Sequence, residues 1–172
     1  MASDETGRDV PRRFIARQPI FDRRQAVFAY ELLFRSSFEN YFNASDGDRA
    51  SSDVIESSLL VFGLDRLLGG HRAFVNVTRR VLLEDLVYLL PAARVVVELL
   101  EEIQPDAEVL AACRRLKRAG YTIALDDYVH RSDLEPLVAL ADIVKIDFRA
   151  TSSDERKRLA ALLARPSRLL LA

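Results

Sequence analysis

The sequence predicts an α/β barrel whose first two strands run antiparallel. From about Phe14 onward, short apolar runs typical of strands alternate with longer stretches of helical periodicity, the pattern of a parallel sheet wrapped in helices. The residues between the first two runs, Asp22–Ala26, are too few for a parallel crossover, so that pair is expected to be antiparallel. Polar residues also end five of the runs, as they do where barrel strands deliver side chains to a site.

Length and composition indicate one globular domain. The chain has 172 residues, 49% of them hydrophobic, which is enough for one sizeable core. The net charge of -1 gives no basic footprint for nucleic acid and no polybasic signal for a membrane, so a small ligand fits better. Residues 1–13 contain acidic residues and lack an apolar stretch, so we expect a mobile tail rather than a signal peptide, and a barrel domain over residues 14–172.

The single cysteine, Cys113, lies in a helical pattern and is expected to be a core thiol. One cysteine excludes a disulfide framework within the chain, so a reducing cytoplasm is the expected location.

Seven apolar runs have the length and composition of strands. Four of them are almost uniformly apolar before a polar end, as strands buried on both faces should be. We therefore expect strands at Arg17–Phe21, Val27–Phe34, Ala73–Val77, Arg94–Leu99, Thr122–Asp127, Ile143–Asp147 and Arg168–Leu171.

The stretches between these runs carry helix signals. Pro105 suits a first helical position and Gly120 suits a helix stop. A helix is also expected over Asp48–Gly69 and another before Pro91. Two serines stand three residues before a glutamate and fit capping boxes, namely Ser132 with Glu135 and Ser152 with Glu155. The expected apolar faces are Val54, Ile55, Leu59 and Phe62, then Leu82, Leu83, Leu86, Val87 and Leu90, then Leu134, Leu137, Val138 and Ala141.

The polar ends of the strands carry the chemistry. Because carboxyl ends of barrel strands meet at one face, their oxygen ligands are expected to form a shared site for Mg²⁺ or Mn²⁺. The alternative is that each residue only caps a helix, forms a turn or aids solubility. The residues are Glu31, Asn76, Glu98, Asp126, Asp127, Lys145 and Asp147.

Lys145 is distinctive because Val144 and Ile146 flank it in a strand that should be buried. A lysine there needs a carboxylate partner or a metal-bound water, and a plain salt bridge to Asp126 or Asp147 is the structural alternative.

Other polar features are weaker. His71 and His130 fall in expected loops without partner ligands, and surface positions are favoured. The arginine clusters Arg79–Arg80 and Arg114–Arg118 lie on helical stretches and are interpreted as solvated faces rather than phosphate grips. The sequence has no Gly-rich phosphate loop, no GxSxG motif and no CxxC pair.

These motifs together resemble the EAL domain family. QPIFD followed by YELLFR is similar to the family's opening, with Glu31 to Leu33 standing where the signature Glu-Ala-Leu would be. FVNVT, VELLE, LDDY and VKID follow in the family's order, and the likeness covers about residues 14–172. The opening is most like the divergent EAL domains that precede an HDOD domain in bacterial signalling proteins.

The resemblance implies a modified TIM barrel that hydrolyses one phosphodiester bond of cyclic di-GMP to pGpG with Mg²⁺ or Mn²⁺. By the same resemblance Asp127 would serve a second metal and Lys145 would hold the attacking water. Arg35 and Asp147 would contact the ligand. The implied metal ligands are Glu31, Asn76, Glu98 and Asp126.

The chain also departs from the family pattern. The family's glycine-containing loop after the paired aspartates reads DYVHRSDLEPL here, and Val129 should stiffen that turn. Glu101 corresponds to the second glutamate of the family's ExTE pattern, but Leu100 replaces the threonine. The chain stops at Ala172, where a further catalytic glutamate and the eighth strand would follow, so the barrel is expected to be incomplete at its C-terminus.

Three functional hypotheses follow from this pattern. The first is a degenerate EAL domain that binds cyclic di-GMP, a related nucleotide or a protein partner and regulates signalling with little or no hydrolysis. The second is an active metal-dependent phosphodiesterase. The third is an interaction scaffold with an empty site, its open barrel edge covered by an HDOD region or by a second copy in a homodimer. An uncovered edge predicts dimerisation, aggregation or low thermal stability.

Overall fold

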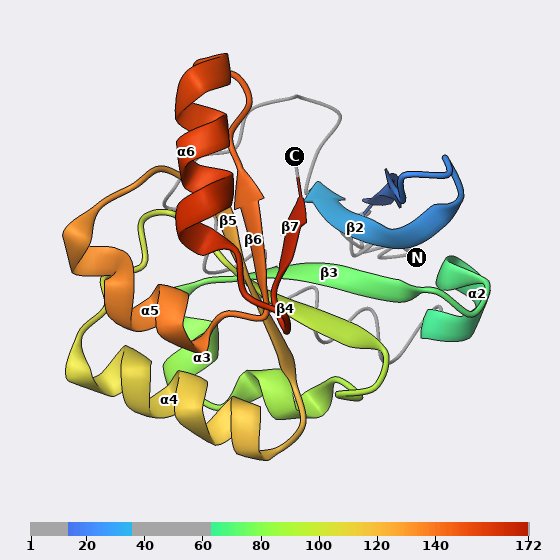
Figure 1. Cartoon of the computed structure of the whole chain (residues 1–172). Helices are drawn as coiled ribbons and strands as arrows, with labels where there is room; N and C mark the ends of the chain where they lie inside the picture. Colours follow the sequence, from blue (N-terminus) through green and yellow to red (C-terminus); the bar gives the residue numbers. More distant parts are fainter. Residues whose placement is uncertain (1–13, 36–62, 172) are drawn as a thin grey trace, which may run out of the picture.

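The described part of the chain folds as a curled, open seven-stranded sheet with helices packed on its outer face (Figure 1). The computed structural model describes residues 14–35 and 63–171; the expected tail and the helix face from Val54 to Phe62 lie outside the described residues. The strands are β1 (Phe14–Phe21), β2 (Val27–Arg35), β3 (Arg72–Val77), β4 (Val95–Leu99), β5 (Thr122–Tyr128), β6 (Ile143–Ile146) and β7 (Leu169–Leu171).

The strand order follows the chain from β1 to β7. The pair β1–β2 is antiparallel and every later neighbouring pair is parallel. All seven predicted strands are present with shifts of at most a few residues at their ends, and the predicted reversal of the first strand is confirmed. Within the described residues, β1 and β7 each pair on one side only, so the sheet stays open between them.

The central strands are buried on both faces, as their uniformly apolar runs predicted. The outer face packs against helices in one large core that includes Val97, Leu125 and Val144. The inner face holds a smaller cluster. Its buried members are Ala29, Phe74, Val96, Ala124 and Ile143.

The helices and turns lie between successive strands, as in a barrel of βα units. They are α2 (Leu64–Leu68), α3 (Arg79–Leu83), a 3₁₀ turn (Leu86–Leu89), α4 (Ala107–Arg118), a 3₁₀ turn (Ser132–Leu134), α5 (Glu135–Leu140) and α6 (Ser153–Leu163). None of the helices in the described part of the chain has the length and apolar character that a membrane span requires.

Two helix starts differ from the prediction. Helix α4 begins at Ala107 because the Asp106 carboxylate accepts a hydrogen bond from Val109 N at 2.9 Å, so Pro105 precedes the cap rather than opening the helix. The expected capping box of Ser132 is wrong, because that residue enters a 3₁₀ turn and makes no side-chain cap bond.

The prediction that the apolar face from Leu82 to Leu90 belongs to one helix is wrong. Asp85 adopts a left-handed conformation with φ 57° and separates α3 from the following 3₁₀ turn. Two other predictions are confirmed, since Ser152 caps α6 and Gly120, with φ 87°, follows the end of α4. Cys113 is buried, as expected of a core thiol.

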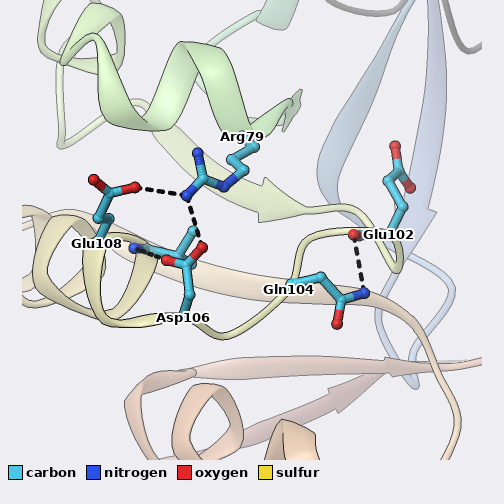
Figure 2. Close-up of polar contacts among 6 residues, drawn as sticks. Arg79, Glu102, Gln104, Asp106 and Glu108 are labelled. Atoms are coloured by element: carbon cyan, nitrogen blue, oxygen red, sulfur yellow. Dashed lines mark hydrogen bonds and ion pairs between the residues drawn. The ribbon is translucent and has the colours of Figure 1, made fainter.

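An arginine joins two of these helices (Figure 2). Arg79, the first residue of α3, lies 2.6 Å from Asp106 Oδ2 and 2.7 Å from Glu108 Oε2 at the start of α4. Both acidic residues stand at the positive end of α4, so the ion pairs connect α3 to a helix terminus that already favours negative charge. All three side chains are exposed, which agrees with the predicted solvated face.

The cap of α6 gives a local stability test. Ser152 Oγ accepts a hydrogen bond from Glu155 N at 3.3 Å, so Ser152→Ala should lower the free energy of unfolding by about 1 kcal/mol. Urea denaturation measures the change. The matched control is Ser153→Ala, one residue inside the helix, which should change stability far less. Equal losses from the two variants would contradict the assigned cap.

Candidate functional site

A layer of polar side chains lies directly above the inner apolar cluster. Strand side chains alternate between faces, so a residue two positions after an inner-face residue also points inward. Each member of the apolar cluster is followed at that spacing by a polar residue, nearer the carboxyl end of its strand. The polar residues are Glu31, Asn76, Glu98, Asp126 and Lys145, from β2, β3, β4, β5 and β6.

The ammonium group of Lys145, on β6, contacts carboxylates from three other strands. Its Nζ lies 2.7 Å from Glu98 Oε1, 2.7 Å from Asp126 Oδ1 and 3.1 Å from Glu31 Oε2. The Glu98 side chain is fully buried and the other three are at most 19% exposed. The structure therefore meets the requirement for a carboxylate partner of Lys145 three times over, and Asp147 is not among the partners.

Burial and neighbouring charge set the protonation of this group. Burial raises the pKa of the Glu98 carboxyl above its usual range; Asp126 and Glu31 act in the same direction, and the Lys145 ammonium opposes them. Burial disfavours the charged form of Lys145, but the Glu98 and Asp126 carboxylates outweigh it and raise the pKa of the lysine above its usual range. Lys145 is therefore held as an ammonium ion.

Two oxygens of the layer still lack any donor. Glu98 Oε1 and Asp126 Oδ1 are paired with the Lys145 ammonium group. Among the described residues, the buried oxygens of the layer with neither a hydrogen bond nor an ion pair are Asn76 Oδ1 and Glu98 Oε2. Orphaned buried oxygens are costly, and such hard donors are the ligands that Mg²⁺, Mn²⁺ and Ca²⁺ prefer. The donor set fits a divalent cation by this chemistry.

The cation site is not preformed. In the described part of the chain, no group of three or more His, Cys, Asp or Glu side chains is arranged so that it could hold a metal ion as it stands. Lys145 already pairs with two of the carboxylates that would serve as ligands, Glu98 and Asp126. A cation and Lys145 would compete for the same oxygens.

The remaining predicted residues lie around this layer rather than in it. Asp127 is exposed and has a left-handed backbone conformation with φ 41°. It lies at a register shift of β5, so its side chain points in a different direction from that of Asp126. Partial burial, with the charges of Asp126 and Asp147, raises the pKa of Asp127. Asp147 Oδ1 accepts hydrogen bonds from Arg149 N at 2.7 Å and Ala150 N at 3.1 Å, so it shapes its own turn.

A cleft of about 290 Å³ opens beside these strand ends. Its polar wall includes Glu101, Asp126, Asp127 and Asp147, which come from the ends of β4, β5 and β6. Arg131, which the sequence analysis did not single out, also lines the cleft and is held by Asp133 at 2.5 Å. Only its place just after β5 could have indicated it.

Arg35, His71 and His130 were also considered as site residues from the sequence. Arg35 ends β2, but its side chain lies outside the described residues. His130 is exposed, as expected, and its Nδ1 lies 3.3 Å from Tyr128 Oη. His71 is half-buried and meets the Tyr30 ring edge-on, so it is less exposed than its expected loop position suggested.

No protein-family model matches the chain, but two curated proteins are similar to most of it. It is 41% identical over 153 residues to the uncharacterised protein YuxH of Bacillus subtilis strain 168, a match covering 86% of this chain and 37% of YuxH. It is 36% identical over 143 residues to the cyclic di-GMP phosphodiesterase CdgJ of Vibrio cholerae, covering 83% of this chain and 33% of CdgJ. The chain thus spans about a third of the length of these relatives.

Solved structures share the fold. One is YkuI of Bacillus subtilis, a protein with an EAL domain in complex with its substrate cyclic di-GMP and calcium; the TM-score is 0.68 at 22% identity, over 92% of this chain and 48% of that one. Another is the manganese and cyclic di-GMP complex of BlrP1 from Klebsiella pneumoniae, with a TM-score of 0.63 at 20% identity, over 90% and 46%. At these identities the likeness establishes the fold alone.

The lysine–carboxylate cluster gives a second stability test, made in EDTA. Lys145→Met leaves Glu98 and Asp126 buried without their counter-charge and should lower the free energy of unfolding by about 3 kcal/mol. Adding Glu98→Gln should recover part of that loss, giving a coupling energy of about 1 kcal/mol or more in a double-mutant cycle.

The matched control is the exposed pair of Asp154 and Lys157, whose cycle with Asn and Met should show coupling close to zero. Additive effects in the Glu98 and Lys145 cycle would contradict the assigned interaction.

Proposed function

Because this chain has the fold of an EAL domain, we propose that it binds cyclic di-GMP at the carboxyl ends of its strands and acts as a regulatory module with little or no hydrolysis. The observation that supports this most is the buried layer in which Glu31, Glu98 and Asp126 surround Lys145. Such a cluster is more than a stable core needs, since apolar residues would fill the same space at less cost.

The layer could hold divalent cations. Glu31, Asn76, Glu98 and Asp126 would be ligands of one cation, and Asp127 would serve a second. When bound, the cations would neutralise phosphate charge and lower the pKa of a bound water. Calcium in the YkuI complex and manganese in the BlrP1 complex support a divalent cation with cyclic di-GMP in proteins of this fold.

Lys145 would act as a hydrogen-bond donor. Because its surroundings keep it protonated, its ammonium group can donate to a phosphate oxygen or to a water oxygen. It cannot accept the proton of an attacking water, so that proton would have to pass to a carboxylate such as Asp127. Arg35, at the end of β2, would contact a ligand phosphate.

Three features support weak hydrolysis rather than efficient turnover. Lys145 already neutralises the oxygens on which cations would depend. The segment after Asp127 carries an exposed Val129 in place of the glycine-containing loop. Asp147 Oδ1 is engaged by backbone N–H groups of its own turn. Hydrolysis depends on positioned charge, whereas binding tolerates a less complete set.

An active phosphodiesterase is the second candidate function. The similarity to CdgJ, a cyclic di-GMP phosphodiesterase that is 36% identical over 143 residues, favours this activity. The retained set of Glu31, Asn76, Glu98, Asp126 and Lys145 is compatible with it.

The open edges of the sheet suit a covering partner. Strands β1 and β7 each leave one side unpaired among the described residues, and unpaired backbone groups favour strand addition or a covering domain. An HDOD domain or a second copy of the chain are the partners that we propose for this edge. A cytoplasmic location belongs to the same proposal.

Binding is tested by isothermal titration calorimetry with cyclic di-GMP and Mn²⁺. We expect saturable binding that weakens about tenfold or more when EDTA replaces Mn²⁺, and again in Glu98→Gln. The matched control is Glu102→Gln, because Glu102 is an exposed carboxylate in the turn after β4 (Figure 2) and should be neutral. No binding at all would favour the interaction-scaffold hypothesis.

Turnover is tested by incubating the chain with cyclic di-GMP and Mn²⁺ or Mg²⁺, followed by chromatography for pGpG. We expect no more product than in a Lys145→Ala control, because both the loop after Asp127 and the cation site depart from what hydrolysis requires. Clear turnover that disappears in the control would instead establish the active enzyme.

A further inference from the structure

A second cleft, of about 330 Å³, lies at the opposite end of the strands from the carboxylate layer. Its walls are the ends of α4, α5 and α6 and the segments that lead from α5 into β6 and from α6 into β7 (Figure 1). The charged residues that line it are Arg114, Lys117, Arg118, Asp142, Arg165 and Arg168. Ala139, Leu140 and Ala141 give it a short apolar wall.

The cleft concentrates positive charge in a chain that is nearly neutral. Five cationic side chains face one carboxylate here, whereas the whole chain has a net charge of -1. Asp142 is already engaged, since it pairs with Lys117 and its Oδ2 accepts a hydrogen bond from Ile123 N at 3.0 Å. Its charge is therefore committed to holding β5 and α4 in place.

Fold stability accounts for two of the five cations. Lys117 pairs with Asp142, and Arg168 donates to the backbone oxygens of Ala141, Leu163 and Val138. The carboxyl-terminal ends of α4, α5 and α6 carry partial negative charge that basic residues complement. Each end is equivalent to only about half a negative charge, so the three ends together do not neutralise five cations.

Three arginines remain without such a role. For Arg114, Arg118 and Arg165, residues 14–35 and 63–171 provide no side-chain hydrogen bond or ion pair. Arg165 also disfavours the charged form of Arg168. Burial lowers the pKa of Arg168, and the nearby charge of Arg165 lowers it further. Five like charges gathered around a hollow with one carboxylate, itself already paired with Lys117, are an arrangement that an anion would relieve.

We propose that this cleft binds a small phosphate compound that carries two or more linked phosphate groups. The planar fork of arginine matches phosphate oxygens bidentately, and three free forks can engage more than one phosphate. The volume of about 330 Å³ lies within the range of small-molecule sites. It suits a compact diphosphate or triphosphate group better than the acidic surface of a folded protein.

This site is independent of the proposed cyclic di-GMP site. The two sites lie at opposite ends of the sheet and share no residue. Sequence reasoning favoured solvated faces for Arg114 to Arg118, because the contribution of Arg165 and Arg168 to the same hollow depends on how α6 returns to β7.

Isothermal titration calorimetry with sodium pyrophosphate, sodium triphosphate and sodium phosphate tests the proposal at near-physiological salt. We expect saturable binding of one pyrophosphate or triphosphate per chain and weaker binding of single phosphate. The variant carrying Arg114→Gln, Arg118→Gln and Arg165→Gln should bind pyrophosphate at least about tenfold more weakly. The control carries Arg23→Gln, Arg24→Gln and Arg66→Gln, three exposed arginines on the β1–β2 turn and α2, and should bind within about twofold of the parent chain.

The single variants Arg118→Gln and Arg165→Gln repeat the test if the triple variant fails to fold, and each should weaken pyrophosphate binding several-fold. Equal weakening in the control triple would show non-specific attraction and overturn the proposal. Binding that does not saturate, or a preference for a hexaglutamate peptide over pyrophosphate, would overturn it as well.

Discussion

The structure depends on the burial of one ammonium group among three carboxylates. Lys145 holds Glu31, Glu98 and Asp126 at the carboxyl ends of four strands, and the fully buried Glu98 would be very costly without it. These contacts require β2, β4, β5 and β6 to bring these four positions to the same level and to curl toward one another. The inner apolar cluster packs one layer below, and its members stand two residues earlier in the same strands. Its packing therefore needs the same curl of the sheet.

Under the proposed function, stability and ligand binding would draw on the same oxygens. The carboxylates that pair with Lys145 are also the ones that would hold a cation, and the lysine that pairs with them would also donate to a phosphate. If Glu98 and Asp126 held a cation, Lys145 would be left to donate to a ligand phosphate, so cation and nucleotide should bind cooperatively.

Sequence reasoning reached the strands and the polar layer for physical reasons. Uniformly apolar runs with polar ends specify buried parallel strands, and the two-residue period places Glu31, Glu98 and Lys145 on one face. It failed where one residue overrides a pattern: the apolar spacing continues through Asp85, whose left-handed backbone breaks the helix. The triple contact of Lys145 and the hydrogen bonds of Asp147 were also out of reach, because they depend on the curl of the sheet and on one turn.

The most direct measurement is a crystal structure of the chain grown with Mn²⁺ and cyclic di-GMP, with the metal located by its anomalous scattering. We expect an Mn²⁺ peak within about 2.0 to 2.6 Å of oxygens from Glu31, Asn76, Glu98 and Asp126. Lys145 Nζ should turn from Glu98 toward a ligand phosphate. A structure in which Lys145 still bridges all three carboxylates, with metal and nucleotide absent or bound elsewhere, would contradict it.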